Sequence, residues 1–298
     1  MKILLTGVAG FISSHLAHEL LSRGHIVYGI DNMSNGKFSN IERCFNSGNF
    51  VFLEEDFTKL LDQIEYVDQV IHLAAVGSVP RSVANPEVTF EHNVIKFHQL
   101  LCSMKDSSCK KLIYASSSSV LGGGKDPNPL SPYALSKFTN ELYAKQFAHT
   151  YGLHTVGMRF FNVYGKNQRE DSPYAAVIPR MLHDAKIKIN APGTQSRDFT
   201  YIKDVVSAII AVMESRHIGP TETFDVGFGE SRNLYELLNI LKRLLPERRF
   251  DFEIVDARPG DVHTSLCDNS PLRTATGWAP QYDLETGLND MLYGEGNK

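Results

Sequence analysis

Short apolar runs alternate with longer amphipathic stretches over the first 160 residues of the chain. Runs of apolar and β-branched residues predict buried strands, and apolar positions at every third or fourth residue predict helices. Gly24 follows the first of these helices, where a glycine commonly ends one. Strands that alternate with helices predict an α/β fold with a parallel, doubly wound sheet. The predicted strands are residues 2–6, 26–30, 49–53, 70–73, 111–115 and 155–159, and the predicted helices are 11–23, 87–104 and 133–150.

The pattern changes after about residue 165. A polar stretch at 167–173 is followed by shorter elements that prolines interrupt. We therefore expect two domains, the sheet domain at 1–165 and a smaller α/β domain at 166–298. In a doubly wound sheet, ligands bind at the carboxyl ends of the strands, so candidate functional residues are sought there.

The turn after the first predicted strand carries Gly7 and Gly10 and leads directly into a helix. Glycines in such a turn let the pyrophosphate of a dinucleotide approach the backbone at the helix N-terminus. A purely structural turn is the alternative. Ser13 stands where a third glycine is usual, and because serine is small it preserves close packing of helix on strand. The context of strand, turn and helix favours a dinucleotide site.

Two aspartates follow the next strands of the predicted sheet. Asp31 lies 21 residues after Gly10, where a carboxylate accepts hydrogen bonds from the adenine ribose and repels a 2′-phosphate. This favours NAD over NADP, with a solvated turn residue as the alternative. Asp56 is placed to meet the adenine, although a role in the turn fits it nearly as well.

Tyr133 and Lys137 lie four residues apart, on one face of a predicted helix. An ammonium beside a phenol favours the phenolate, so this tyrosine is a candidate base near neutral pH. The pair follows a strand that ends in the four serines 116–119. One of these hydroxyls can orient a substrate hydroxyl beside the tyrosine, but side-chain chemistry alone does not say which.

Arg197 and Arg258 lie in loop-like contexts in the second part of the chain. Two guanidinium groups there can hold a diphosphate as paired forks. Surface ion pairing is the alternative for both.

Composition excludes several function classes. Thirty Lys and Arg against 34 Asp and Glu give a formal charge of −4, so no basic excess is present to hold a nucleic acid. The four cysteines show no Cys-x-x-Cys pair and the 11 histidines no metal-ligand spacing, so we expect reduced thiols, a cytoplasmic protein and no metal. The first apolar run ends at Thr6, and no membrane span or secretory leader is expected.

Taken together, these motifs resemble the extended short-chain dehydrogenase/reductase family, specifically its NAD-dependent nucleotide-sugar epimerases and dehydratases. The resemblance covers nearly the whole chain and implies a Rossmann-type NAD-binding domain followed by a nucleotide-sugar-binding domain. It rests on residues 7–11, 31–32, 72–75, 116–119, Tyr133, Lys137, 159–165, 197–199 and 258–261.

The resemblance assigns Ser117, Tyr133 and Lys137 as the catalytic trio. Dehydratases and decarboxylases of the family usually carry an acidic residue one or two places after the Ser or Thr, where this chain has Ser118 and Ser119. The sequence therefore favours epimerisation at C4 of a UDP-sugar through a 4-keto intermediate. The alternatives are a dehydratase, decarboxylase or reductase of the family, and a non-catalytic NAD(H)-binding regulatory protein.

The resemblance also implies the binding residues. The cofactor candidates are Gly7, Gly10, Phe11, Ile12, Asp31, Asn32, Asn35, Gly36, Asp56, Phe57, Leu73, Ala74, Ala75, Asn93, Tyr133, Lys137 and Phe161. The substrate candidates are Ser78, Ser117, Tyr133, Asn162, Ala176, Val177, Ile189, Asn190, Arg197, Arg258, Asp261 and Ser265.

Three further features bear on the substrate and the assembly. Segments 77–82 and 174–179 resemble those of UDP-N-acetylglucosamine 4-epimerases, and Ser265 leaves room for an N-acetyl group, so N-acetylated UDP-sugars are favoured over UDP-glucose and UDP-galactose. Residues 121–132, between the serines and Tyr133, form a shorter stretch than is usual in the family. Helices 87–104 and 133–150 correspond to those that pair in family dimers, so a homodimer through a four-helix bundle is expected.

Overall fold

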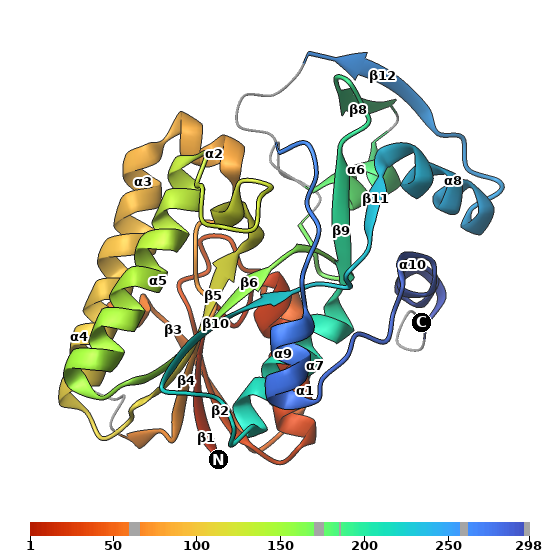
Figure 1. Cartoon of the computed structure of the whole chain (residues 1–298). Coiled ribbons are helices and arrows are strands. Elements are labelled where there is room, and N and C mark those ends of the chain that lie inside the picture. The colour runs from red at the N-terminus through yellow and green to blue at the C-terminus, as the bar shows by residue number, and fades with distance from the viewer. Residues whose placement is uncertain (60–65, 170–175, 185, 257–261, 295–298) are drawn as a thin grey trace.

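A seven-stranded parallel sheet forms the larger part of the molecule in the computed structural model, which describes residues 1–59, 66–169, 176–184, 186–256 and 262–294 (Figure 1). The strand order is β3-β2-β1-β4-β5-β6-β10, so the direction of winding reverses between β1 and β4. This confirms the predicted Rossmann-type doubly wound fold. The strands are β1 (Lys2–Thr6), β2 (Ile26–Asp31), β3 (Phe50–Glu54), β4 (Gln69–His72), β5 (Lys111–Ser117), β6 (His154–Phe160) and β10 (Thr221–Val226).

Helices cover both faces of this sheet because its strands are apolar on both sides. Ile3 and Leu5 of β1 join one buried core with Leu16 of α1, whereas Leu4 points the other way and joins a second core with Phe97 of α4. Helices α1 and α7 lie on the first face and α4 and α5 on the second (Figure 1). Their bounds are α1 (Phe11–Ser22), α7 (Ile202–Glu214), α4 (Lys96–Asp106) and α5 (Pro132–Tyr151).

The end of α1 agrees with the sequence prediction. Gly24 has a φ of +77°, and its amide donates to the Leu21 carbonyl while the His25 amide donates to the Leu20 carbonyl. A left-handed glycine after the last turn therefore closes the helix.

The long helical stretch predicted at 87–104 is confirmed, but it contains an irregular turn that the sequence did not predict. The chain forms α3 (Pro86–Phe90), then a π-helical turn (Glu91–Ile95), then α4, and a further short helix, α2 (Val79–Ala84), precedes them. Within the π-helical turn the Asn93 carbonyl accepts a hydrogen bond of 2.9 Å from Asn140 Nδ2 of α5. The irregular turn thus couples this helical segment to the helix that carries Tyr133 and Lys137.

Two smaller sheets build the smaller region of the molecule. One has the order β11-β9-β7, and the other pairs β12 with β8 in parallel. Helices α6, α8 and α10 accompany them, and α9 packs beside β10 (Figure 1). The bounds are β7 (Asn162–Tyr164), α6 (Val177–His183), β8 (Lys186–Asn190), β9 (Ser196–Tyr201), β11 (Ser231–Asn233), α8 (Leu234–Leu244), β12 (Asp251–Val255), α9 (Ser270–Thr276) and α10 (Leu284–Tyr293).

Strand β10 comes from the second part of the sequence but belongs to the larger sheet. It runs parallel to β6 with Phe224 opposite Met158 and Val226 opposite Phe160, and all four side chains are buried. The sheet therefore draws on both sides of the boundary expected at residue 165.

None of the helices in the described ranges is both long enough and apolar enough to cross a membrane.

Candidate active site

One cavity of about 700 Å³ lies along the carboxyl ends of the sheet strands. It extends from the Gly7–Gly10 turn, past the serine cluster and Tyr133, to Arg197 and Ser265 in the smaller region. Its size is that of a site for a cofactor or small-molecule ligand, and it joins the two regions of the chain.

The turn between β1 and α1 presents backbone rather than side chains to this cavity. Gly7 has a φ of +70°, and a Cβ there would lie 2.9 Å from Ala74 Cα. The first amides of α1 have no partner within the helix, and Gly10 at the N-cap has no side chain to satisfy them. The turn therefore fits an anionic group, such as the pyrophosphate of a dinucleotide.

The Asp31 carboxylate stabilises this turn through hydrogen bonds from backbone amides. Its Oδ2 accepts a 3.0 Å hydrogen bond from the Ala9 amide and its Oδ1 a 2.9 Å bond from the Met33 amide. Burial raises the pKa of Asp31, and the two amide hydrogen bonds oppose that effect. A Cβ on Gly36 would lie 2.7 Å from Ala9 Cβ and 3.1 Å from both Asp31 oxygens, so a glycine is needed there. Each carboxylate oxygen keeps a lone pair for a ribose hydroxyl.

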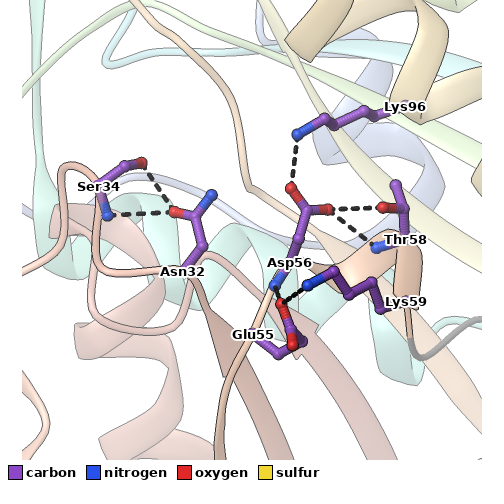
Figure 2. Close-up of polar contacts among 7 residues, drawn as sticks. All are labelled: Asn32, Ser34, Glu55, Asp56, Thr58, Lys59 and Lys96. Atoms are coloured by element: carbon purple, nitrogen blue, oxygen red, sulfur yellow. Dashed lines mark hydrogen bonds and ion pairs between the residues drawn. The ribbon is translucent and has the colours of Figure 1, made fainter.

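Asp56 lines the far end of the cavity and is tied to Lys96 of α4. Its Oδ2 lies 2.5 Å from Lys96 Nζ, and its Oδ1 accepts from the Thr58 hydroxyl and amide, as Figure 2 shows. Burial acts to raise the pKa of Asp56, but the Lys96 and Thr58 hydrogen bonds outweigh it and hold the pKa below its usual value. The turn role weighed in the sequence is thus present, and the side chain lines the cavity as well.

Two guanidinium groups donate hydrogen bonds to the same oxygen of Asn35, on the wall of the cavity. Arg81 of α2 donates to Asn35 Oδ1 at 3.3 Å, and Arg169, beyond β7, donates to the same oxygen at 3.1 Å. All three residues line the cavity. Among the residues that the structure describes, no carboxylate forms an ion pair with Arg81.

The start of α5 places Tyr133 and Lys137 at the centre of the cavity. Ser131 caps the helix by accepting from the Ala134 amide, Pro132 occupies the first turn, and the Tyr133 amide donates to Ser82 Oγ at 3.0 Å. Lys137 is buried, and its Nζ donates to the Ala115 carbonyl at 2.9 Å.

The structure gives different contacts to the four serines 116–119, among which the sequence alone could not choose. Ser116 is buried and donates to Glu141. Ser117 is hydrogen-bonded to Tyr133 and donates to Ser119 Oγ at 3.0 Å. Ser118 and Ser119 begin a short 3-10 turn (Ser118–Leu121) on the cavity wall. Ser117 is therefore the serine hydroxyl that faces the phenol.

Burial dominates the acid–base properties of this centre. It raises the pKa of Tyr133, and the Ser117 hydrogen bond opposes this effect. The lowering of the Tyr133 pKa that the sequence predicted from Lys137 is therefore not found. Burial lowers the pKa of Lys137 to about 8, and the Glu141 carboxylate opposes it. His72, buried and then further affected by Lys137, has a pKa lowered to about 3 and stays neutral.

The cavity wall that carries Arg197 and Ser265 is assembled from separate segments. Arg197 of β9 donates through Nη1 to the carbonyls of Ser196 and His263, at 2.9 and 3.3 Å. The Ser265 amide donates to the Ser196 carbonyl at 3.1 Å, which fixes the segment at 262–266 beside β9. Asp198, next to Arg197, is fully buried and accepts from the amides of Phe228, Gly229 and Cys267, so its role is structural.

The shortened stretch before Tyr133 forms a compact loop. The Gly124 amide donates to the Leu121 carbonyl and the Asn128 amide to the Val120 carbonyl, at 2.9 and 2.8 Å. Gly123 has a φ of +86°, and a Cβ there would lie 2.6 Å from Val262 Cγ1. The loop therefore packs against the segment at 262–266 and forms part of the cavity wall.

Most of the predicted site residues line this cavity. The cofactor candidates that do so are Gly7, Gly10, Phe11, Ile12, Asp31, Asn32, Asn35, Gly36, Asp56, Phe57, Leu73, Ala74, Ala75, Tyr133, Lys137 and Phe161. The substrate candidates that do so are Ser78, Ser117, Tyr133, Asn162, Ala176, Arg197 and Ser265. Arg258 and Asp261 lie outside the described residues, and of Asn190 the structure describes only its place in β8.

Three predicted residues lie outside the cavity lining. Asn93 is buried, and its carboxamide is bound to the Val76 backbone and to Ser136 Oγ. Ile189 is 1% exposed and belongs to the apolar core. Val177 begins α6 and packs against the same core. In each case, packing or backbone hydrogen bonds occupy the side chain.

Sequence reasoning missed the charged residues that complete the site. Lys96 and Arg81 line the cavity, and Glu141 and Arg159 form a buried pair behind it. Glu141, four residues after Lys137 on α5, was the one with a usable signal in the sequence. Within the described residues, no three His, Cys, Asp or Glu side chains gather closely enough to hold a metal ion.

Comparison with known proteins agrees with this geometry. The model of the NAD dependent epimerase/dehydratase family matches residues 3–227. The UDP-glucuronate 4-epimerase of Thermodesulfobacterium geofontis is 34% identical, over 96% of this chain and 93% of the relative.

Two solved structures cover nearly the whole fold. The UDP-N-acetylglucosamine 4-epimerase of Methanobrevibacter ruminantium, in complex with UDP-N-acetylmuramic acid, has a TM-score of 0.90 at 36% identity and covers 98% of this chain and 96% of its own. A mutant UDP-glucuronic acid 4-epimerase of Bacillus cereus, bound to NAD and a fluorinated UDP-sugar, has a TM-score of 0.91 at 31% identity, covering 99% and 98%.

The chain belongs to the NAD-dependent epimerase/dehydratase family. NAD is the cofactor of this family. The residues present fit it, because the turn at Gly7 and Gly10 offers unpaired helix amides to the pyrophosphate and Asp31 offers carboxylate oxygens to the ribose.

Proposed function

We propose that this protein is a UDP-sugar 4-epimerase with tightly bound NAD. One observation carries the proposal: Ser117, Tyr133 and Lys137 meet in a single cavity, midway between the dinucleotide turn and the Arg197 wall. The catalytic groups thus lie where a cofactor on one side and a nucleotide sugar on the other bring their reacting atoms together.

The roles of the three residues follow from their positions. Tyr133, as the phenolate, takes the proton from the sugar 4-hydroxyl and later returns it. Ser117 hydrogen-bonds the same sugar oxygen. Lys137 holds the nicotinamide ribose, and its positive charge favours the phenolate against the effect of burial. Bound NAD supplies a reversible hydride acceptor for C4.

Epimerisation also requires that the 4-keto sugar rotate between the two hydride transfers, so that its opposite face meets the cofactor. Binding energy must therefore rest on the UDP rather than on the sugar. Asn162 and Arg197 hold the diphosphate, with Arg258 as a further candidate and Asp261 for the uridine ribose. Ser118 and Ser119 offer hydroxyls where a dehydratase needs a carboxyl group, so proton transfer at carbon has no obvious donor.

For the sugar we propose an N-acetylhexosamine, with UDP-glucose and UDP-galactose as weaker substrates. Ser265 places a small side chain on the substrate wall, which leaves space for an N-acetyl group. The UDP-N-acetylglucosamine 4-epimerase of M. ruminantium, at 36% identity, supports the same choice.

The test is one incubation series without added NAD. Purified protein receives UDP-N-acetylglucosamine, UDP-glucose or UDP-glucuronic acid, and the products are analysed by mass spectrometry and NMR. We expect an isomer of unchanged mass, formed fastest from UDP-N-acetylglucosamine. A product that differs in mass, or net formation of NADH, would instead identify a dehydratase, decarboxylase or reductase. Faster conversion of UDP-glucuronic acid would refute the sugar assignment alone.

The division of labour between the domains is also a proposal. Residues 1–165, completed by β10, bind NAD, and residues 166–298 supply the nucleotide-sugar side. The positions of the Gly7 turn and of Arg197 at opposite ends of the cavity support it.

We further propose a cytoplasmic homodimer. Leu135 and Leu142, seven residues apart on α5, and Phe90 of α3 are more than half exposed, which suits a helical interface with a second copy. Light scattering should give a dimer mass for the protein and a monomer mass for Leu142→Glu. Val51→Glu, an exposed apolar residue on β3, serves as the control. The four free thiols, of which three are buried, suit a reducing compartment.

A further inference from the structure

A buried chain of polar side chains lies directly behind the proposed catalytic residues. Ser116 of β5 donates to Glu141 Oε1, and Arg159 of β6 donates through Nε to Oε1 and through Nη2 to Oε2, both at 2.8 Å. Arg159 Nη1 lies 3.5 Å from Asp225 Oδ1 of β10. The middle of α5 is thereby linked to the carboxyl ends of three neighbouring strands.

Glu141 and Arg159 form a bidentate ion pair that is largely shielded from solvent. The Glu141 side chain is 7% exposed and that of Arg159 is 16% exposed. Two parallel N–H···O bonds join the planar groups, and Ser116 occupies a further lone pair of the carboxylate. A buried carboxylate is tolerated when it is paired and hydrogen-bonded in this way, whereas removal of one partner leaves the other charge uncompensated.

This polar network adjoins the proposed catalytic residues on both α5 and β5. Glu141 lies one helical turn after Lys137 on α5, and Lys137 Nζ donates to the carbonyl of Ala115, the residue before Ser116. Ser116 itself precedes Ser117 on β5. Because Glu141 holds the Ser116 hydroxyl, Ser117 is left as the hydroxyl that faces Tyr133.

We propose that Glu141 is a positioning residue for the catalytic centre: held by Arg159, it fixes α5 against the end of β5 so that Lys137 keeps its charge and its place. The inference rests on the proposed catalytic roles of Lys137 and Ser117. Arg159 and Asp225 act through Glu141 and contact neither reacting group.

The charges around Lys137 predict that loss of Glu141 changes the pKa of Lys137, which can be measured. Glu141 and Tyr133 face Lys137 from α5, His72 from β4, and Arg159 and Asp225 lie beyond Glu141 on β6 and β10. Burial lowers the pKa of Lys137 to about 8, and Glu141 is the charge that opposes this. His72 is neutral, so it cannot replace the carboxylate. Loss of Glu141 therefore lets Lys137 give up its proton at a lower pH.

The experiment compares Glu141→Gln with Glu141→Asp in the NAD-loaded protein. We expect the alkaline limb of the kcat/KM profile of E141Q to move down by about one pH unit, a tenfold change in the ionisation equilibrium. E141D keeps the charge but shortens the side chain, so its limb stays in place while kcat falls about tenfold. Glu19→Gln removes the carboxylate of an exposed Glu–Arg pair on α1 and should change neither quantity.

A second readout does not depend on turnover. The Lys137 ammonium is titrated by NMR in protein labelled with ε-13C lysine, with Lys137→Arg used to assign the signal. The same downward shift is expected in E141Q. An unchanged limb and an unchanged Lys137 midpoint in folded E141Q would overturn the proposal. If E141Q does not fold, E141D decides: wild-type kcat in E141D would also overturn it.

These outcomes separate this proposal from the proposed function. A wild-type protein that converts no UDP-sugar, yet whose Lys137 midpoint moves in E141Q, refutes the function and leaves the coupling in place. An active wild type with no shift in E141Q refutes the positioning role alone.

Discussion

The two ends of the cavity are built in different ways. At the end proposed to bind the cofactor, which is called the cofactor end below, side chains mainly hold backbone: Asp31 fixes the amides of Ala9 and Met33, and Asn40 Nδ2 donates to the Ala9 carbonyl at 2.8 Å. At the end proposed to bind the substrate, the substrate end, Arg197 and Ser265 come from segments almost 70 residues apart that backbone hydrogen bonds to Ser196 and His263 bring together.

This difference indicates which end of the cavity has to be rigid before a ligand binds. A permanently bound cofactor favours a preformed cradle whose parts are local in sequence, because local contacts order at little entropic cost. A sugar that must rotate within the site favours a wall that binds the nucleotide tightly and makes few contacts with the sugar itself. Four substitutions test this contrast, starting with the reaction centre between the two ends.

Tyr133→Phe should abolish turnover while leaving both ends intact. Removal of a positioned acid–base group costs about 10²–10⁴ in rate, so we expect kcat to fall by that factor, with bound NAD and the affinity for UDP unchanged. Product formation, NAD content and UDP titration measure the three quantities. Full activity in the variant would refute the proposed mechanism.

Gly7→Ala should damage the cofactor end alone. The left-handed conformation costs an alanine about 1–2 kcal/mol, and the new Cβ meets Ala74 Cα at 2.9 Å, so that β4 or the turn must shift. We expect loss of bound NAD and a total destabilisation of about 3 kcal/mol, measured by NAD release and thermal unfolding.

Gly24→Ala is the matched control. Gly24 has a similar φ of +77°, but a Cβ there meets nothing within 4 Å. It should lose about 1 kcal/mol and retain NAD. Equal loss of NAD in both variants would show that global stability, rather than the turn, retains the cofactor.

Arg197→Met should affect the substrate end alone. A hydrogen bond to a charged group contributes about 1.5–3 kcal/mol, so we expect KM for the UDP-sugar to rise about 10- to 100-fold with NAD content unchanged. Arg243→Met, which removes the exposed ion pair between Arg243 of α8 and Glu285 of α10, controls for loss of surface charge. An unchanged KM would remove Arg197 from the diphosphate site.

Asp56→Asn should give the smallest effect and a pH signature. Because the folded-state pKa of Asp56 is lowered, its contribution to stability is present above the unfolded pKa of about 3.9 and is lost as pH falls through the folded value. The difference in the free energy of unfolding between wild type and variant, on the order of 1 kcal/mol, should therefore be constant near neutrality and shrink below about pH 4; thermal unfolding as a function of pH measures it. Glu55→Gln, in the exposed neighbouring pair with Lys59, should give a smaller difference (Figure 2).

The glycine turn, the Asp31 carboxylate and the Tyr133–Lys137 pair could be predicted from sequence because their signals are contiguous. Gly7 and Gly10 mark the turn, Asp31 lies at the end of the next strand, and Tyr133 and Lys137 fall on one helix face. Each depends on spacing within a single element or between adjacent ones. The fold class followed from the same local periodicity.

The rest depends on partners far apart in the chain. Lys96 meets Asp56, and Arg159 meets Glu141 and Asp225, only after the helices dock on the sheet. Asn93 fits the pattern of a ligand-facing residue, yet the π-helical turn and Ser136 determine its contacts. Such choices are made by tertiary packing, which periodicity along one element does not encode.

The position of β10 has a consequence for synthesis. A growing chain that has reached residue 165 has made six of the seven strands, and β6 is then an unpaired edge with Val156 and Met158 in the core layers. The sheet is completed only when residue 226 has left the ribosome. A truncated protein that ends at 165 should therefore aggregate, whereas one that ends soon after β10 is the shortest fragment expected to fold and bind NAD.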